Sequence, residues 1–283
     1  MLSKALAEPS DESIDGRSAT TPRELHLILV AFHPSAAEVG RLEICLAQLP
    51  LQIGYVVVVN DHTPGEPVER LQAGADLFLT TQKNPGYGSA VNWAAHQLLA
   101  SGVAGPWIAA MNTDLTWDPG SFETLLAWLN QRPDVVLAVP QIVDPAGTVQ
   151  QLCKTDPALL ALLSRRFLPE CCKPRALRTY DRRYVMADRN YEEPMDVAYL
   201  SGCCMLIRRS AFEAVGGFDE RFFLYLEDAD LSRSLRAMGR CMHVPLARVR
   251  HAWGRGNHRS LRLTLVNLMS AWLYFRKWGF KLY

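Results

Sequence analysis

The sequence predicts an α/β protein in which a mainly parallel, Rossmann-like sheet is flanked by helices. Short β-rich apolar runs alternate with helical patterns through the first half of the chain, which is the pattern of βαβ units. The first runs are apolar almost throughout, as expected of strands buried on both faces. The chain has 283 residues, 49% of them hydrophobic. That is enough to bury the core of one large domain or two small ones.

Strands and helices alternate along this first half. The expected strands are residues 25–32, 55–61, 75–81, 107–114 and 135–143. The expected helices lie between them, at residues 36–49, 68–73, 88–99 and 119–130. Parallel α/β sheets bind ligands at the carboxyl ends of their strands. Two of those ends are polar here, Asn60-Asp61 and Asn112-Thr113-Asp114, so we expect the ligand beside them.

The second half of the chain is less regular. Between residues 150 and 194, nine Lys or Arg stand against six Asp or Glu, with several prolines among them. A helix is expected within residues 157–168 and a strand over 197–209. From residue 261 apolar side chains recur near helical spacing between basic ends, which predicts an amphipathic helix over 261–283.

Composition excludes several classes of protein. A net charge of +1 gives no case for nucleic-acid binding. No run of about 18 apolar residues predicts a membrane-spanning helix, and the polar residues 1–22 predict a disordered tail rather than a signal peptide. The seven cysteines form no C-x-x-C pair and are odd in number, which argues against a zinc site or a full disulfide framework. We expect reduced thiols and a cytoplasmic protein.

A cluster of carboxylates is the most unusual local feature. In "FFLYLEDADLSRSLRAMG" the residues Glu227, Asp228 and Asp230 follow an apolar and aromatic run, and a helical pattern begins after Asp228. One interpretation is structural: Asp228 caps the helix, its neighbours favour the positive end of the dipole, and Arg233 and Arg236 pair with them. The other is that this helix start holds a catalytic group.

Three segments together resemble glycosyltransferase family 2, which has the GT-A fold, and within it the bacterial rhamnosyltransferases. The most specific is "LSGCCMLIRRSAFEAVGGFDERFFLYLEDADLSRSLRAMGR", residues 200–240. "NPGYGSAVN", residues 84–92, resembles the glycine-rich segment of the family, and "MNTD" stands where the family has its D-x-D. The likeness covers residues 25–258. It implies one GT-A domain over 23–260, with a donor half at 23–145 and a smaller acceptor half at 146–260.

The resemblance implies an inverting, metal-dependent sugar transfer from a nucleotide diphosphate donor to an acceptor hydroxyl. Inversion in one step needs a base that takes the acceptor proton. The Asp of the family's E-D pair, here Asp228, is that base. Glu227 then shapes the acceptor pocket, and Asp230 serves the helix.

The developing charge of the leaving diphosphate needs a cation, Mg²⁺ or Mn²⁺. The resemblance implies Asp114 as a metal ligand, and a histidine at the place of His251 can complete the site. Asn112 departs from the acidic first position of the motif. A neutral amide there can hydrogen-bond the ribose of the donor.

The resemblance also implies the donor-binding residues. Either Asn60 or Asp61 contacts the base or the ribose. The matching positions of the glycine-rich segment are Asn84, Gly86, Gly88 and Asn92, where glycine permits a close approach of the backbone to the donor. Arg255 and Arg259 are further candidates for the diphosphate oxygens, and His258 is a weaker candidate than His251.

The subgroup resemblance implies dTDP-L-rhamnose as the donor and a cell-surface or lipid-linked glycan, such as lipopolysaccharide, as the acceptor. The basic 150–190 segment and the C-terminal helix then allow peripheral contact with the inner membrane. Two alternatives stay open. The same fold can use UDP-galactofuranose or a UDP-N-acetylhexosamine, or the chain can be a non-catalytic nucleotide-sugar-binding protein. No G-x-G-x-x-G follows the first strand, which excludes a nicotinamide-dependent dehydrogenase.

Overall fold

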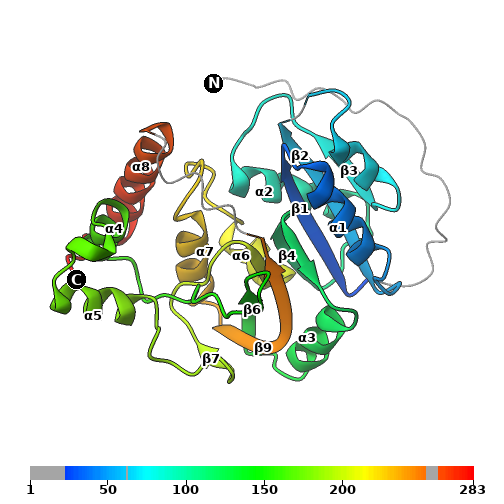
Figure 1. The fold of residues 1–283 in the computed structure, drawn as a ribbon. Coiled ribbons are helices and arrows are strands. Elements are labelled where there is room, and N and C mark those ends of the chain that lie inside the picture. Colours follow the sequence, from blue (N-terminus) through cyan, green and yellow to red (C-terminus); the bar gives the residue numbers. More distant parts are fainter. Residues whose placement is uncertain (1–22, 62, 253–260) are drawn as a thin grey trace.

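A mixed β-sheet runs through the centre of the molecule (Figure 1). The structure is a computed structural model that describes residues 23–61, 63–252 and 261–283. The predicted tail 1–22 and the candidates Arg255, His258 and Arg259 lie outside the described residues. The strands of the sheet are β1 (Leu25–Phe32), β2 (Ile53–Asp61), β3 (Leu77–Thr80), β4 (Trp107–Asn112), β5 (Leu115–Trp117), β6 (Val135–Val143), β7 (Met195–Asp196), β8 (Cys204–Arg208) and β9 (Arg240–His251).

Helices cover both faces of this sheet (Figure 1). They are α1 (Ala36–Leu46), α2 (Tyr87–Ala100), α3 (Ser121–Asn130), α4 (Leu159–Phe167), α5 (Arg175–Tyr184), α6 (Arg209–Val215), α7 (Glu227–Leu235) and α8 (Leu261–Trp278), with short 3₁₀ turns at Pro67–Gln72 and Glu170–Cys172. Apolar side chains of α1 and α3 share one core with the sheet. Those of α2, α6 and α7 share the other. The predicted α/β class, with helices packed on the sheet, is therefore confirmed.

The first half of the chain forms the parallel part of the sheet, in the order β3-β2-β1-β4. β1 is buried along its length except at Phe32, as its uninterrupted apolar run predicts. In register, Phe32 of β1 lies opposite Asp61 of β2, and Val30 lies opposite Asn112 of β4. The two polar strand ends named from the sequence therefore meet at one edge of the sheet.

The second half of the chain adds strands whose antiparallel pairing the sequence did not predict. β8 lies between β4 and β6 and is antiparallel to both, so the predicted strand 135–143 is not the next parallel neighbour of β4. β9, which went unpredicted, pairs with β6 in parallel and with β5 antiparallel. The expected strand 197–209 is shorter than predicted, because β8 begins only at Cys204 and residues before it form a loop. All seven cysteines are free and five of them are buried.

The C-terminal helix α8 packs beside α4 and α7 at the edge of the molecule (Figure 1). Tyr274 and Phe275 of α8 are buried with Phe222 and Leu226, which precede α7. The first turn of α4 is held by backbone hydrogen bonds of 2.9–3.0 Å to the carbonyls of Lys281 and Leu282. α8 ends at Trp278 rather than at the predicted residue 283. The next residue, Gly279, adopts a left-handed backbone conformation with φ +89°.

Candidate active site

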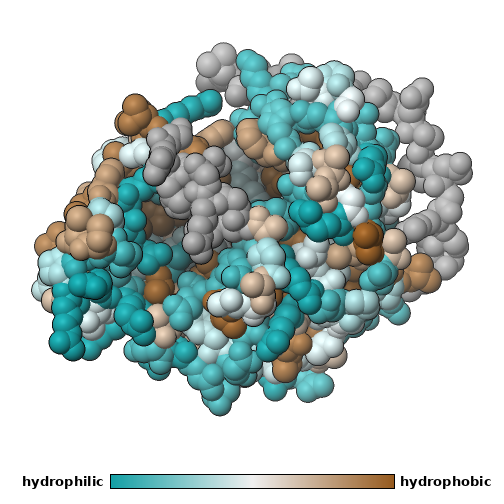
Figure 2. Space-filling model, viewed as in Figure 1, coloured by the Kyte–Doolittle hydropathy of each residue, from teal (hydrophilic) through white to brown (hydrophobic). Residues whose placement is uncertain are grey.

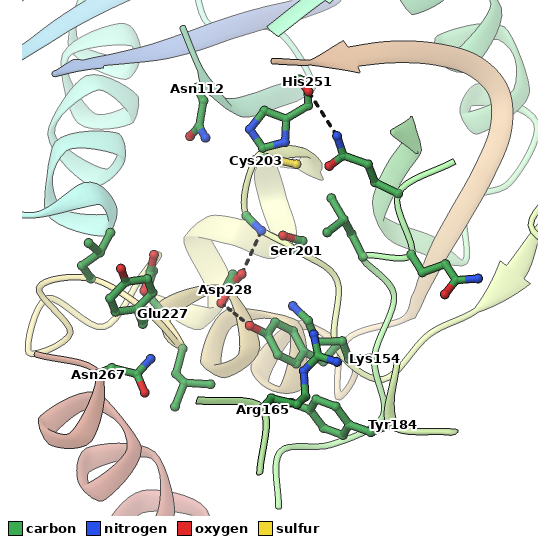
Figure 3. Close-up of a pocket in the computed structure, with 18 of the residues that line it drawn as sticks. Asn112, Lys154, Arg165, Tyr184, Ser201, Cys203, Glu227, Asp228, His251 and Asn267 are labelled. Atoms are coloured by element: carbon green, nitrogen blue, oxygen red, sulfur yellow. Dashed lines mark hydrogen bonds between the residues drawn. The ribbon is translucent and has the colours of Figure 1, made fainter. Parts of the chain in front are cut away.

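A pocket of about 720 Å³ opens at the edge of the sheet where β4 and β9 end. It brings together four residues that the sequence named, Asn112, Glu227, Asp228 and His251 (Figure 3). They come from β4, from the first turn of α7 and from the end of β9. Residues from segments 144–166, 199–203 and 224–226 also line the pocket, together with Tyr87, Tyr184 and Asn267. Residues separated by more than 130 positions in the sequence thus share one cavity.

The Asp228 carboxylate is buried and held by three hydrogen bonds. The Tyr199 hydroxyl donates to Oδ1 at 3.0 Å, and the N–H of Ala229 donates to the same oxygen at 2.9 Å. The N–H of Gly202 donates to Oδ2 at 2.9 Å. Donors on both oxygens fix the plane of the carboxylate.

The predicted role of Asp228 as the helix cap is wrong. The helix begins one residue earlier, at Glu227, and its N-cap residue is Leu226, with no side-chain cap. Tyr225 and Leu226 both adopt left-handed backbone conformations, with φ of +70° and +63°. Such conformations cost about 1–3 kcal/mol for each non-glycine residue and gather at functional sites. This turn directs the side chains of the first helical residues into the pocket.

Glu227 is also buried on the pocket wall. Its Oε2 atom has no hydrogen-bond partner among the described residues. Burial, reinforced by the neighbouring Asp228 carboxylate, raises the pKa of Glu227 to about 8. Burial therefore favours the protonated form of Glu227, which can donate a hydrogen bond to a bound group.

Asp230, the third acid of the cluster, points away from the pocket and binds α8. It accepts hydrogen bonds from Lys277 Nζ at 2.8 Å and from Trp278 Nε1 at 2.7 Å. The predicted pairing of this cluster with Arg233 and Arg236 is not found. The Arg233 guanidinium carbon lies 4.7 Å from the centre of the Trp278 ring. Arg236 pairs with Asp156 instead, with Nη1 3.7 Å from Oδ1.

Asp114 and His251 lie side by side because β5 pairs with β9. Leu115 is opposite His251 in register, and Asp114 Oδ2 lies 3.1 Å from His251 Nε2. Two neighbouring ligands at about 2.1 Å from an octahedral cation are about 3 Å apart, so this pair fits one edge of such a site. Asp114 Oδ1 is buried without a hydrogen-bond partner among the described residues. Among all the residues that the structure describes, no group of three or more His, Cys, Asp or Glu side chains has metal-site geometry.

The glycine-rich segment packs against the loop that leads into α7. Gly86 has φ +96°, and a Cβ atom there would lie 2.4 Å from the Phe223 carbonyl oxygen. Asn60 donates a hydrogen bond of 2.9 Å to Asn84 Oδ1, which also accepts from the Gly86 N–H at 2.9 Å. The protein's own backbone at Phe223 therefore already requires glycine at position 86.

Gly88 and Asn92 extend the same contact along α2. A Cβ atom on Gly88 would lie 2.7 Å from Phe218 Cβ. The Asn92 amide donates to the Phe218 carbonyl at 2.8 Å and accepts from the Phe218 N–H at 2.9 Å. Neither residue lines the pocket, nor do Asn60, Asp61, Asn84, Gly86 and Asp114. Asp61 is exposed, and its Oδ2 atom lies 3.8 Å from His33 Nε2. Contact of these residues with a donor stays a prediction.

The pocket also contains residues that were not among the predicted site residues. Tyr87 follows Gly86, and its hydroxyl donates to the Gly202 carbonyl at 2.8 Å. Gly202 lies inside the long segment 200–240 and could have been named from it. Tyr199, Lys154 and Arg165 carry no signal in sequence, because only the tertiary fold brings them near Asp228.

Known proteins resemble this chain in both sequence and fold. The model of the family described as "Glycosyltransferase like family 2" matches residues 22–274. The "N-acetylglucosaminyl-diphospho-decaprenol L-rhamnosyltransferase" of Mycobacterium tuberculosis (strain ATCC 25618 / H37Rv) is 32% identical over 271 residues, covering 88% of this chain and 86% of that protein.

Two solved structures have a similar fold at low sequence identity. GalNAc-T7 with UDP, GalNAc and Mn²⁺ aligns with a TM-score of 0.58 at 13% identity, over 84% of this chain and 46% of that one. The mannosyltransferase PcManGT of Pyrobaculum calidifontis, in complex with GDP-Man and Mn²⁺, aligns with a TM-score of 0.55 at 16% identity, over 84% of this chain and 59% of that one. The chain thus spans about half the length of these two proteins.

Proposed function

Because this chain belongs to glycosyltransferase family 2, we propose that it transfers L-rhamnose from dTDP-L-rhamnose, with inversion, to a hydroxyl of a lipid-linked or cell-surface glycan. The chain is a rhamnosyltransferase-like glycosyltransferase. The observation that carries the proposal is the Asp228 carboxylate, fixed by three donors in the same pocket as His251. The similarity to the mycobacterial rhamnosyltransferase supports the choice of sugar.

In this mechanism Asp228 is the base. The acceptor hydroxyl hydrogen-bonds to its carboxylate and gives up its proton as the oxygen attacks the anomeric carbon. The leaving diphosphate departs on the opposite side of the sugar, which inverts the centre. Tyr199 and Gly202 hold the carboxylate in one orientation, so little reorganisation accompanies the attack.

Asp114 and His251 would hold the divalent cation, Mg²⁺ or Mn²⁺, with the donor diphosphate and water. When bound, the cation supplies positive charge that stabilises the leaving diphosphate. The 3.1 Å separation of Asp114 Oδ2 and His251 Nε2, together with the unpartnered buried Asp114 Oδ1, suits such a ligand pair. Asn112, which lines the pocket, would contact the donor as a neutral hydrogen-bonding group.

Thermal stabilisation by nucleotide sugars tests the donor assignment. With Mn²⁺ or Mg²⁺ present, we expect dTDP-L-rhamnose at 100 times its Kd to stabilise the fold by about 2.7 kcal/mol. At the same concentration, UDP-galactofuranose and UDP-N-acetylglucosamine should stabilise the fold less. Asp114→Asn should abolish the part of the stabilisation that depends on the metal. A larger thermal shift with a UDP-sugar would show that this UDP-sugar, and not dTDP-L-rhamnose, is the donor. No shift with any nucleotide sugar would overturn the donor site.

Substitution of the base separates an enzyme from a non-catalytic binding protein. Asp228→Asn keeps the shape of the side chain but removes its basicity, so kcat should fall by about 10²–10⁴-fold. Binding of dTDP-L-rhamnose should not change. If the variant transfers sugar at the wild-type rate, Asp228 is not the base.

We further propose that the enzyme works at a membrane surface. Side chains Leu261, Leu265, Leu268, Met269 and Trp272 form one exposed stripe on α8, and Leu160, Leu163 and Phe167 form another on the adjacent α4. Apolar side chains are visible over these helices in Figure 2. Exposed arginines of α5 lie next in the chain. Within the described residues no helix is long and apolar enough to cross a bilayer, so this contact would be peripheral.

Sedimentation with vesicles tests the membrane contact. We expect binding to vesicles that contain anionic phosphatidylglycerol and weaker binding to pure phosphatidylcholine. Leu265→Glu should weaken binding by at least about tenfold, because a leucine contributes about 1.5–3 kcal/mol on burial. Ile44→Glu, on the equally exposed outer face of α1, is the matched control. Equal binding of both variants would contradict the proposal.

A further inference from the structure

Lys154, Arg165 and Arg166 all line the pocket, and Lys154 and Arg165 lie on the side away from His251. In Figure 3 the Asp228 carboxylate lies between His251 at one end and Lys154 and Arg165 at the other. The proposed mechanism assigns the donor diphosphate to the Asp114 and His251 end. It assigns no function to the two cations.

Lys154 is placed by the backbone next to the residue that holds the base. Its N–H donates to the Tyr199 carbonyl at 2.9 Å, and the Tyr199 N–H donates back at 3.0 Å. Its ammonium lies 4.1 Å from the centre of the Tyr199 ring. No described carboxylate forms an ion pair with it. A partly buried ammonium without a carboxylate partner is unfavourable, and an anionic ligand would offset that.

Arg165 reaches the same end of the pocket from α4. Its guanidinium is 6.0 Å from the Tyr184 ring and makes no ion pair within the described part of the chain. The next residue, Arg166, instead hydrogen-bonds Thr264 of α8. Arg165 therefore stands at the inner side of α4, whose outer side carries the exposed Leu160, Leu163 and Phe167.

We propose that Lys154 and Arg165 bind the diphosphate of a lipid-diphosphate-linked acceptor sugar. This inference rests on the proposed lipid-linked acceptor. Such an acceptor has its groups in a fixed order: sugar hydroxyl, diphosphate, lipid. The protein presents matching groups in the same order, namely the Asp228 base, the two cations and the apolar stripes of α4 and α8. Guanidinium and ammonium groups are strong partners of phosphate oxygens.

Binding of geranyl diphosphate in EDTA tests the anion site without the metal-dependent donor site. Lys154→Met and Arg165→Gln should each raise its Kd about tenfold or more, while the matched control Arg178→Gln, an exposed arginine of the same basic segment, leaves it unchanged. Geraniol should bind equally to all forms. The proposal is overturned if the two variants bind geranyl diphosphate with the wild-type Kd. It is also overturned if they weaken the binding of dTDP-L-rhamnose while the Kd of geranyl diphosphate is unchanged.

Kinetics with two acceptors of the same sugar give a second test. One acceptor carries an isoprenyl diphosphate and the other a neutral alkyl chain. Lys154→Met and Arg165→Gln should raise KM about tenfold for the first and not for the second, with kcat preserved. An equal rise for both acceptors would contradict a diphosphate site. If the wild type uses neither acceptor but the geranyl diphosphate result holds, the anion site stands and the proposed sugar transfer fails.

Discussion

The Tyr199 hydroxyl donates a 3.0 Å hydrogen bond to Oδ1 of Asp228, from a loop 29 residues earlier in the chain. Tyr199 is buried, and this burial raises its pKa well above the usual value. The hydroxyl therefore stays protonated and remains a donor across the pH range in which the enzyme would work. This bond ties the orientation of the proposed base to the acceptor half of the molecule.

Removal of this hydroxyl should slow the reaction without affecting donor binding. Tyr199→Phe takes away one of the three donors and lets the carboxylate rotate. We expect kcat to fall about tenfold, equal to about 1.4 kcal/mol, with an unchanged Kd for the nucleotide sugar. Tyr191→Phe is the matched control, because Tyr191 is also buried but donates to the Val185 carbonyl. Equal losses in both variants would point to general loosening of the fold.

The stability of the protein should depend on the protonation of Glu227. Its pKa is about 8 in the folded state because of burial and the adjacent Asp228, and about 4.3 in an unfolded chain. Between these values the folded state binds the extra proton, so the free energy of unfolding falls as pH rises, by up to about 1.4 kcal/mol per pH unit. Glu227→Gln mimics the neutral acid. Denaturant unfolding at pH 6 and pH 9 should show a smaller decrease in the variant than in the wild type.

Gly86 should tolerate no side chain. Gly86→Ala would force a Cβ atom against the Phe223 carbonyl at 2.4 Å in a left-handed backbone conformation. We expect a loss of more than about 3 kcal/mol in the free energy of unfolding. Gly102→Ala isolates the conformational part, since Gly102 has φ +74° and open space around it, and should lose about 1–2 kcal/mol. Similar losses at the two sites would show that the backbone contact is unimportant.

Asp230 should matter for the attachment of α8 rather than for chemistry. The Asp230 carboxylate is nearly fully buried and pairs with Lys277. Asp230→Asn removes its negative charge. We expect a loss of about 2–4 kcal/mol of stability and weaker vesicle binding, with donor binding retained. The half-exposed pair of Asp156 and Arg236 is the comparison. Asp156→Asn should lose no more than about 1 kcal/mol. A loss of donor binding in Asp230→Asn would assign Asp230 to the site instead.

The amino-acid sequence by itself determined the parallel half of the sheet and its polar edge. Strands such as 25–32 are apolar throughout because both faces are covered, and that pattern is local. It also singled out Asp228 and Glu227, because the segment 200–240 is long and specific. A strand was expected near β8, but β9 and the places of both strands in the sheet could not be predicted, because their pairing with β4 and β6 depends on contacts between distant segments.

Only the tertiary structure decided how the three acids of "EDAD" divide. All three share one helix start and one local pattern, so the sequence could not separate them. Their environments come from other parts of the chain. Tyr199 and Gly202 orient Asp228, burial raises the pKa of Glu227, and Lys277 and Trp278 hold Asp230 against α8. The physical reason is that solvation and hydrogen bonding at a side chain depend on neighbours in space, which local sequence does not specify.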